Sequence, residues 1–283
     1  MPTPDPTRIL RQHLQTDALL GAPTVPTPVA PSAPGPAHSP QPTTKQTARP
    51  AASAMAPTQT PAFSLSAPPS RTTTPPLPPA HPADIKLLEG LSTADKLQHL
   101  EQLSAVFESD AKVQALRPPG TNLVFGEGDV DAKLMFIGEG PGETEDRLGR
   151  PFVGPAGELL DKMITAMGLS REQVYIANVV KYRPPGNRTP TPEEAAVQGP
   201  YLARQVAIIR PTALVALGGA AAKYALSTTT GITRLRGQWA QFVHTDPTLP
   251  IMPTFHPAYL LRSYTPDNRK KVWADLQAVL KKL

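Results

Sequence analysis

Cysteine is absent from the 283-residue chain. Without a thiol the protein forms no disulfide, uses no cysteine nucleophile and holds no iron–sulfur cluster on thiolates. The P-loop signature G-x-x-x-x-G-K-[ST] is missing as well, which removes the common sequence pattern of a nucleotide phosphate site.

Charged and large apolar side chains are scarce in residues 1–83, which contain seven charged residues and 21 of the 37 prolines. A segment of this composition cannot bury enough apolar surface to offset its chain entropy. We therefore predict a disordered tail over 1–83, with one possible short helix near 8–20. Residues 84–283 are long enough to form one domain.

Long apolar runs are also missing. No stretch approaches the roughly 20 residues that cross a bilayer, and the N-terminus lacks the apolar segment of a secretory signal. We expect a cytoplasmic monomer with no membrane partner. Five basic and two acidic residues in 1–83 supply +3 of the formal charge of +5, so 84–283 carries +2. That value alone is a weak indication of nucleic-acid binding.

Helix and strand patterns alternate through the domain. A helix is predicted over 85–116, and short apolar runs predict four strands, at 133–138, 173–180, 213–219 and 250–257. Amphipathic segments follow each strand. This order is typical of a three-layer α/β/α fold with a central, mainly parallel four-stranded sheet. Ligands of such sheets bind at the carboxyl ends of the strands.

The first of these strand ends opens the segment FIGEGPGETEDRLGRPFVGPAGELLDKM, residues 136–163. Its glycines are spaced as G-x-G-x-G and do not lead directly into a helix, so the dinucleotide fingerprint is not met. Glu139 stands between two glycines, where a fixed carboxylate could orient water or face a developing positive charge. Glu143 is better interpreted as a solvated acid, and Glu145 is intermediate.

Three more residues near strand ends suggest a ligand site. Phe152 lies in a Pro/Gly loop, where an aromatic ring can stack on a base. Asn178 interrupts an apolar strand, and a buried amide needs partners from protein or ligand. His256 follows the last strand. Each of them alone is more often structural, but together with Glu139 they describe a pocket for a flat polar ring.

Three motifs in this order resemble the family 4 uracil-DNA glycosylases: FIGEGPGETEDRLGRPFVGPAGELLDKMI, YIANVVKYRPPGNRTPTPEEA and TFHPAYLLR. The resemblance spans residues 100–283, approximately. It implies a DNA repair enzyme that flips uracil out of DNA and hydrolyses its N-glycosidic bond, leaving an abasic site. One alternative is an inactive, DNA-binding relative. A relative that crosslinks to the abasic site is disfavoured, because GNRTPTPEE contains no histidine.

The resemblance also implies catalytic roles. Glu139 resembles the catalytic acidic residue, and His256 resembles the imidazole that hydrogen-bonds the uracil O2. Gly140 stands where other uracil-DNA glycosylase families place a water-activating Asp. Three more residues resemble a loop that enters the DNA and contacts phosphates: Leu260, Leu261 and Arg262.

Uracil binding is implied for three residues. Asn178 resembles the amide that reads the pairing edge of uracil, and Phe152 resembles the aromatic residue that stacks on the base. Glu145 resembles the residue that crowds C5 of the ring and excludes thymine. The implied partner is therefore uracil-containing DNA.

One departure concerns the cofactor. The family typically holds a 4Fe-4S cluster on four cysteines, and the corresponding positions here are Tyr182, Gln198 and, by a looser alignment, Asp110 and Val113. None of these residues supplies a thiolate. We therefore predict that this chain has no cluster and no metal, and that Tyr182 with neighbouring apolar groups fills the space.

Overall fold

The computed structural model describes residues 88, 90–245 and 249–283. The predicted tail over 1–83, its helix near 8–20 and the domain boundary at 84 lie outside the described residues. In the described part no helix is long and apolar enough to cross a membrane.

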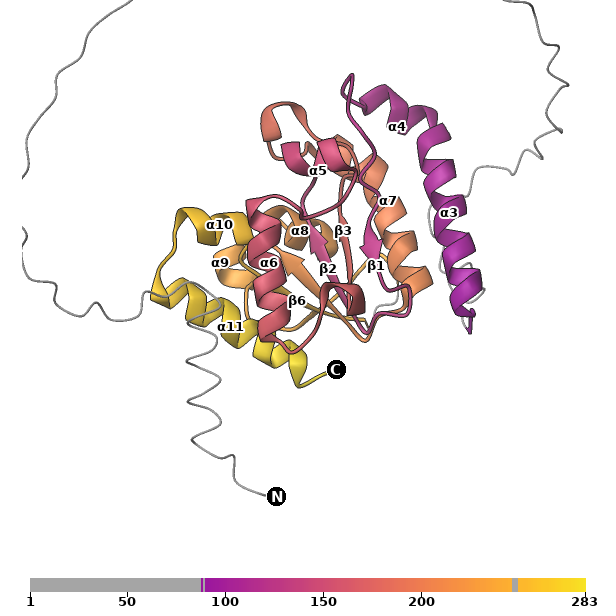
Figure 1. Cartoon of the computed structure of the whole chain (residues 1–283). Coiled ribbons are helices and arrows are strands. Elements are labelled where there is room, and N and C mark those ends of the chain that lie inside the picture. Colours follow the sequence, from indigo (N-terminus) through magenta and orange to yellow (C-terminus); the bar gives the residue numbers. More distant parts are fainter. Residues whose placement is uncertain (1–87, 89, 246–248) are drawn as a thin grey trace, which may run out of the picture. The chain divides into compact units, whose positions relative to one another are not determined.

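The centre of the fold is a β-sheet (Figure 1). It has six strands, in the order β1-β3-β2-β4-β6-β5. Its four inner strands run parallel to one another and match the four predicted strands. They are β2 (Leu134–Gly138), β3 (Tyr175–Asn178), β4 (Ala213–Leu217) and β6 (Pro250–Thr254).

The prediction of four strands was wrong by two, because a short antiparallel strand closes each edge of the sheet. These edge strands are β1 (Glu127–Gly128) and β5 (Ala240–Gln241). Each has only two residues, so neither contains the apolar run or alternation that marks a strand in a sequence.

Helices cover both faces of the sheet and give the predicted three layers (Figure 1). Met135 and Ile137 of β2 pack into a core with helices α3 (Thr93–Ser109) and α7 (Pro192–Ile209). Their neighbours Leu134 and Phe136 pack into a second core with α6 (Pro155–Ala166) and α11 (Pro266–Leu280). Successive side chains of a strand point to opposite faces, which explains the two cores.

Shorter helices complete the described part: α4 (Ala111–Leu116), α5 (Glu143–Leu148), α8 (Gly219–Ala225), α9 (Ile232–Leu235), α10 (Pro257–Arg262), and the 3₁₀ turns η1 (Arg171–Gln173) and η2 (Pro185–Asn187). The single helix predicted over 85–116 is two helices. Asp110 adopts an extended backbone and its side chain caps α4, accepting a hydrogen bond from the N–H of Lys112 at 2.8 Å.

Candidate active site

A cavity of about 580 Å³ opens at the carboxyl ends of the parallel strands. Seven of the nine residues to which the sequence assigned a role line it: Glu139, Gly140, Glu145, Phe152, Asn178, His256 and Arg262. Leu260 and Leu261 do not line it. The carboxyl ends of the parallel strands, where ligands of such sheets bind, therefore bring together residues that lie more than 120 positions apart in the chain.

The last residue of β2, Gly138, has no room for a side chain. It pairs with Asn178 in the sheet register, so the two strand ends lie side by side. A Cβ atom at Gly138 would lie 2.2 Å from Oδ1 of Asn178 and 2.5 Å from Cε2 of Phe152. Any larger residue would displace the amide or the ring, so the missing side chain lets both close on the cavity.

Asn178 is 1% exposed at the end of β3. Within the described residues, its buried Oδ1 has no hydrogen-bond partner. Its main-chain carbonyl accepts a hydrogen bond from Nζ of the fully buried Lys181 at 2.8 Å, and burial lowers the pKa of Lys181 well below its usual range. A buried oxygen without a partner costs about 1–3 kcal/mol, so a fixed, unpaired acceptor in a cavity wall is a feature that a ligand donor would relieve.

Phe152 is 5% exposed and has a φ of 51°, in the left-handed region that residues other than glycine rarely adopt. Such a backbone costs on the order of 1–3 kcal/mol and persists only where neighbouring groups hold it. The ring centroid lies 5.6 Å from that of His256, with 31° between the ring planes. A strained residue thus places an aromatic ring in the wall of the cavity.

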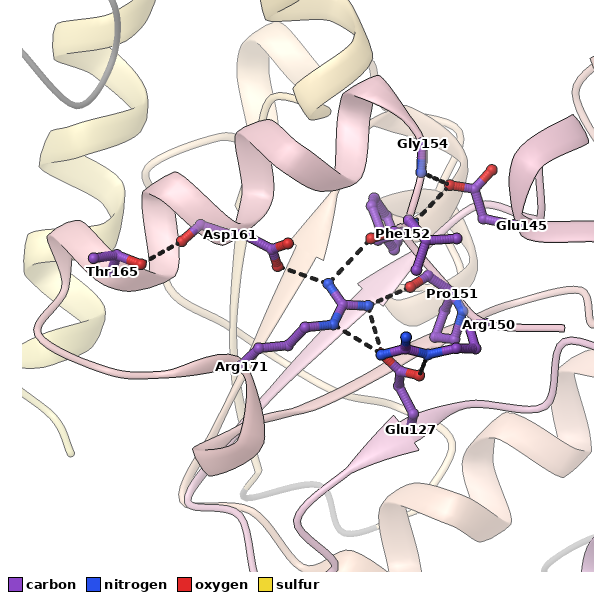
Figure 2. A network of polar contacts seen from close by, with 10 residues as sticks. Glu127, Glu145, Arg150, Pro151, Phe152, Gly154, Asp161, Thr165 and Arg171 are labelled. Atoms are coloured by element: carbon purple, nitrogen blue, oxygen red, sulfur yellow. Dashed lines mark hydrogen bonds and ion pairs between the residues drawn. The ribbon is translucent and has the colours of Figure 1, made fainter. Parts of the chain in front are cut away.

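Glu145 lies on α5 and holds the loop that carries Phe152 (Figure 2). Its Oε1 accepts hydrogen bonds from the N–H groups of Val153 at 2.9 Å and Gly154 at 2.8 Å. Gly154 is the N-cap of α6 and has no side chain to cap the helix. The Glu145 carboxylate instead accepts the N–H of this residue and places a negative charge at the helix N-terminus. Glu145 therefore both lines the cavity and anchors the loop that carries Phe152.

His256 is partly buried and caps α10, accepting a hydrogen bond from the N–H of Ala258 on Nδ1 at 3.1 Å. Burial lowers its pKa to about 4, with a further lowering by Arg262 and an opposing effect of Glu145. The imidazole is therefore neutral near pH 7. Since Nδ1 is an acceptor, the ring proton sits on Nε2, which remains as a donor.

Glu139 and Gly140 follow β2 directly and line the cavity, with Glu139 partly buried. The main-chain carbonyl of Glu139 accepts a hydrogen bond from the N–H of Val180 at 3.2 Å, which fixes its backbone. A Cβ atom at Gly140 would lie 2.7 Å from Cγ2 of Val180. The backbone at Gly140 therefore lies so close to Val180 that a larger residue would fit only if Val180 moved.

The three residues assigned to DNA contacts separate in the structure. Arg262 lines the cavity, and Leu261 is 46% exposed. Leu260 is 3% exposed and packs in the core with α6 and α11, so its side chain is not available to DNA. The periodicity of a helix explains this split, because successive side chains on α10 point about 100° apart and so cannot all face the core.

Sequence reasoning missed Gly218, which follows β4 and lines the cavity. Its φ is 91°, and a Cβ atom there would lie 2.9 Å from Cβ of His256. The double glycine at the end of the third predicted strand, 213–219, was a usable signal, since ligands bind at the carboxyl ends of all these strands.

The 184–190 segment also lines the cavity and was missed, as were Thr233 and Tyr259. Within that segment, Arg188 forms a two-pronged ion pair with Glu194, with Nη–Oε distances of 2.7 and 2.8 Å. Glu194 also closes the capping box of Thr191 at the start of α7. The start of α7 thus fixes the loop that forms this side of the cavity.

The positions that correspond to cluster ligands form a packed aromatic site. Tyr182 is 2% exposed, and its ring centroid lies 5.5 Å from that of Phe107. The Arg117 guanidinium sits 4.6 Å from the centroid of the Tyr182 ring, and Nε2 of Gln114 donates to its hydroxyl at 3.3 Å. The Tyr182 ring is therefore packed against Phe107 and Arg117, and its hydroxyl accepts a hydrogen bond.

The other three positions also have structural partners. Oε1 of Gln198 accepts the N–H of Lys181 at 2.7 Å, Asp110 accepts the Tyr201 hydroxyl at 2.6 Å, and Val113 is buried. In the described part of the chain, no group of three or more His, Asp or Glu could hold a metal ion. These donors do not fit an iron–sulfur cluster, which is held by thiolates.

The part of the chain that forms the cavity is similar in sequence to known proteins. A family model described as the uracil DNA glycosylase superfamily matches residues 125–277. The type-4 uracil-DNA glycosylase of Thermotoga maritima is 48% identical over 158 residues, which cover 56% of this chain and 81% of that protein. Those of Sulfurisphaera tokodaii and Archaeoglobus fulgidus are 45% and 42% identical, covering 56% of this chain and 74% and 81% of those proteins. The residues matched by the family model include every residue of the cavity.

Proposed function

The chain belongs to the uracil DNA glycosylase superfamily as a type-4 uracil-DNA glycosylase, and we propose that the cavity at its strand ends binds and excises uracil. It is a DNA repair enzyme and a hydrolase of N-glycosidic bonds, and its substrate is DNA that contains uracil. A base inside a duplex is out of reach of such a cavity. Uracil must therefore be flipped out of the stack, at a cost of a few kcal/mol.

The observation that carries the proposal is the unpaired Oδ1 of Asn178. Uracil presents an N3–H donor on its pairing edge, beside the O4 acceptor. A side-chain amide matches this pair, with Oδ1 accepting from N3–H and Nδ2 donating to O4. Cytosine has an acceptor at N3 and a donor at C4, so it would leave buried polar groups unpaired, which a site of this kind can reject by about 10⁴-fold or more.

His256 and Glu139 supply the chemical step in this proposal. A water oxygen bonds to C1′ while the C1′–N1 bond breaks, and the bonding electrons leave with uracil as an anion. The water loses a proton as it bonds, and a proton neutralises the uracil anion, so the products are the abasic site and neutral uracil. Nε2–H of the neutral His256 donates to O2, where that negative charge builds up. The Glu139 carboxylate orients the water and faces the positive charge that develops on the sugar.

Three contacts hold the base and the DNA in the proposed complex. Phe152 stacks on the flipped uracil, Glu145 lies beside C5, and Arg262 and the exposed Leu261 contact the DNA strand. Leu260 is omitted because it is buried. The alternative of an inactive DNA-binding relative is not favoured, since the groups that the chemistry needs all line one cavity.

A cleavage assay tests the proposed function. The purified chain is incubated with an end-labelled oligonucleotide that contains one uracil, and the product is treated with alkali to cut at abasic sites. We expect scission at the uracil and none in a matched oligonucleotide with thymine. Intact strands at micromolar enzyme would refute the proposed activity.

Uracil release is expected to be independent of iron. We propose that the packed Tyr182 site replaces the cluster, since its partners are aromatic rings and hydrogen-bonding side chains. Treatment with a strong iron chelator and dialysis should leave the single-turnover rate unchanged within about two-fold. An absorption band of an iron–sulfur cluster in the purified protein, or loss of activity on chelation that added iron restores, would contradict this prediction.

Residues 1–83 are proposed to be dispensable for excision. Their composition is that of a flexible tail, and every residue of the cavity lies within 139–262. A chain that starts at Asp84 should match the full-length rate on short oligonucleotides. If that chain has the same circular dichroism but is inactive, the tail completes the active site and the boundary at 84 is wrong.

A further inference from the structure

The loop that carries Phe152 is held from both sides by charged side chains (Figure 2). The two main-chain N–H groups that follow Phe152 donate to the Glu145 carboxylate, at 2.9 and 2.8 Å. The carbonyl groups of Pro151 and Phe152 point the other way and accept hydrogen bonds from Arg171. The left-handed backbone of Phe152 is what directs these consecutive groups to opposite partners.

All three guanidinium nitrogens of Arg171 donate hydrogen bonds. Nη1 donates to the Phe152 carbonyl at 3.1 Å and to Oδ1 of Asp161 at 2.7 Å, while Nη2 donates to the Pro151 carbonyl. Nε donates to Oε1 of Glu127 at 2.8 Å. Only a planar group with several fixed donors can satisfy two carbonyls and two carboxylates together, so lysine is not equivalent here.

Two carboxylates hold the guanidinium in place. Glu127 on β1 and Asp161 on α6 come from separate elements, and the Arg171 side chain between them is 15% exposed. Burial alone would raise the pKa of Glu127, but hydrogen bonds from Arg150 and Arg171 outweigh it and lower the pKa. Glu127 therefore stays ionised near pH 7 and fixes the cation that binds the loop.

Arg150 offers a built-in comparison. It forms an ion pair with the same Glu127 carboxylate at 2.7 Å, but its side chain is 59% exposed. The hydrogen bonds of its guanidinium go to Glu127 and not to the loop carbonyls. Removal of Arg150 thus changes the charge around Glu127 without removing a contact to the strained peptide groups.

We propose that Arg171 is a positioning residue for uracil excision, which acts by holding the strained backbone of Phe152 so that the ring presents its face to the base. The inference rests on the proposed function, since it concerns the ring on which uracil stacks. Arg171 itself is absent from the cavity wall. Without its two hydrogen bonds, the Phe152 backbone would relax from the left-handed region and the ring would leave its place.

A double-mutant cycle tests this role. Single-turnover rates and half-saturating enzyme concentrations are measured for the wild type, Arg171→Met, Phe152→Ala and the double variant on one uracil oligonucleotide. Phe152→Ala should lose about 5- to 150-fold, the range expected for one base–aromatic stack. Arg171→Met should lose a similar factor, but in the Phe152→Ala background it should lose less than about two-fold, because both changes remove the same contact.

Arg150→Met is the matched control and should stay within about two-fold of the wild type. Melting temperatures are recorded for every variant, and if Arg171→Met does not fold, the cycle is repeated with Arg171→Lys, which keeps the charge but not the fork. Losses that multiply in the double variant would show that Arg171 only stabilises the fold and would overturn the inference. A wild type that releases no uracil would overturn the proposed function itself, and a wild type that is active with multiplying losses would overturn only the role of Arg171.

Discussion

Asn178→Ala is expected to slow uracil release by about 10²–10³-fold in single-turnover assays, the loss typical of one preorganised donor or acceptor in an active site. The wild-type amide is held by a fully packed strand end and contributes a carbonyl oxygen that has no other partner in the described part of the chain. The alanine variant keeps the cavity but cannot pair with N3–H and O4 of uracil. Its folded state should not suffer, because a buried unpaired oxygen is removed.

The control for this variant is Gln277→Ala, which removes an exposed amide on α11 that does not line the cavity. Its rate should equal that of the wild type. An Asn178→Ala protein with an unchanged rate would mean that uracil is read elsewhere. A rate loss accompanied by a lower melting temperature would instead assign Asn178 a structural role.

His256→Ala is expected to cause a second large loss, also about 10²–10³-fold, because the donor to the developing charge on O2 disappears. His256→Gln keeps a side-chain donor and should retain part of the rate. Equal rates for the wild type and the alanine variant would exclude Nε2–H as the group that stabilises the uracil anion.

The pH dependence of stability provides an independent test of the neutral imidazole. In the folded protein the pKa of His256 is about 4, while in the unfolded chain it is near its ordinary value of 6.5. Between these values the unfolded state binds more protons, so stability falls as the pH is lowered through this window. The wild type should lose on the order of 1–2 kcal/mol more of its free energy of unfolding between pH 6.5 and 4.5 than His256→Gln. Parallel curves for the two proteins would contradict a buried neutral His256.

The strand-end residues could be predicted because a simple rule of parallel sheets applies to them. Asn178 interrupts an apolar run and His256 follows one, so a pattern of strands alone places both at the same edge. The caps of α7 and α11 were also predictable, because Thr followed by Pro marks a helix start in the sequence itself.

Other features depend on contacts that no local pattern records. The break at Asp110 follows from a side chain that caps α4 and also meets Tyr201, which is far along the chain. The edge strands β1 and β5 are too short to show periodicity. The expectation that the glycines at 138–142 do not lead directly into a helix was wrong, because Gly142 is the N-cap of the short helix α5, where three acids stabilise the first turn.

The loop of Phe152 shows the same limit inside the site. The sequence indicated an aromatic residue among Pro and Gly, but it did not show that the backbone there is left-handed. That conformation is imposed by Glu145 and Arg171, which lie on opposite sides of the loop in sequence and in space. The sequence correctly placed Gly138 at the end of a strand, but it did not show that the missing side chain leaves room for the Asn178 amide.

The most direct test of the central claim is a crystal structure of the protein with free uracil and an oligonucleotide that contains an abasic site. The account predicts uracil in the cavity at the strand ends, with N3 about 2.7–3.2 Å from Oδ1 of Asn178. It also predicts the face of Phe152 against the ring and Nε2 of His256 at O2. Uracil bound outside this cavity, or an Asn178 amide turned away from the base, would contradict it.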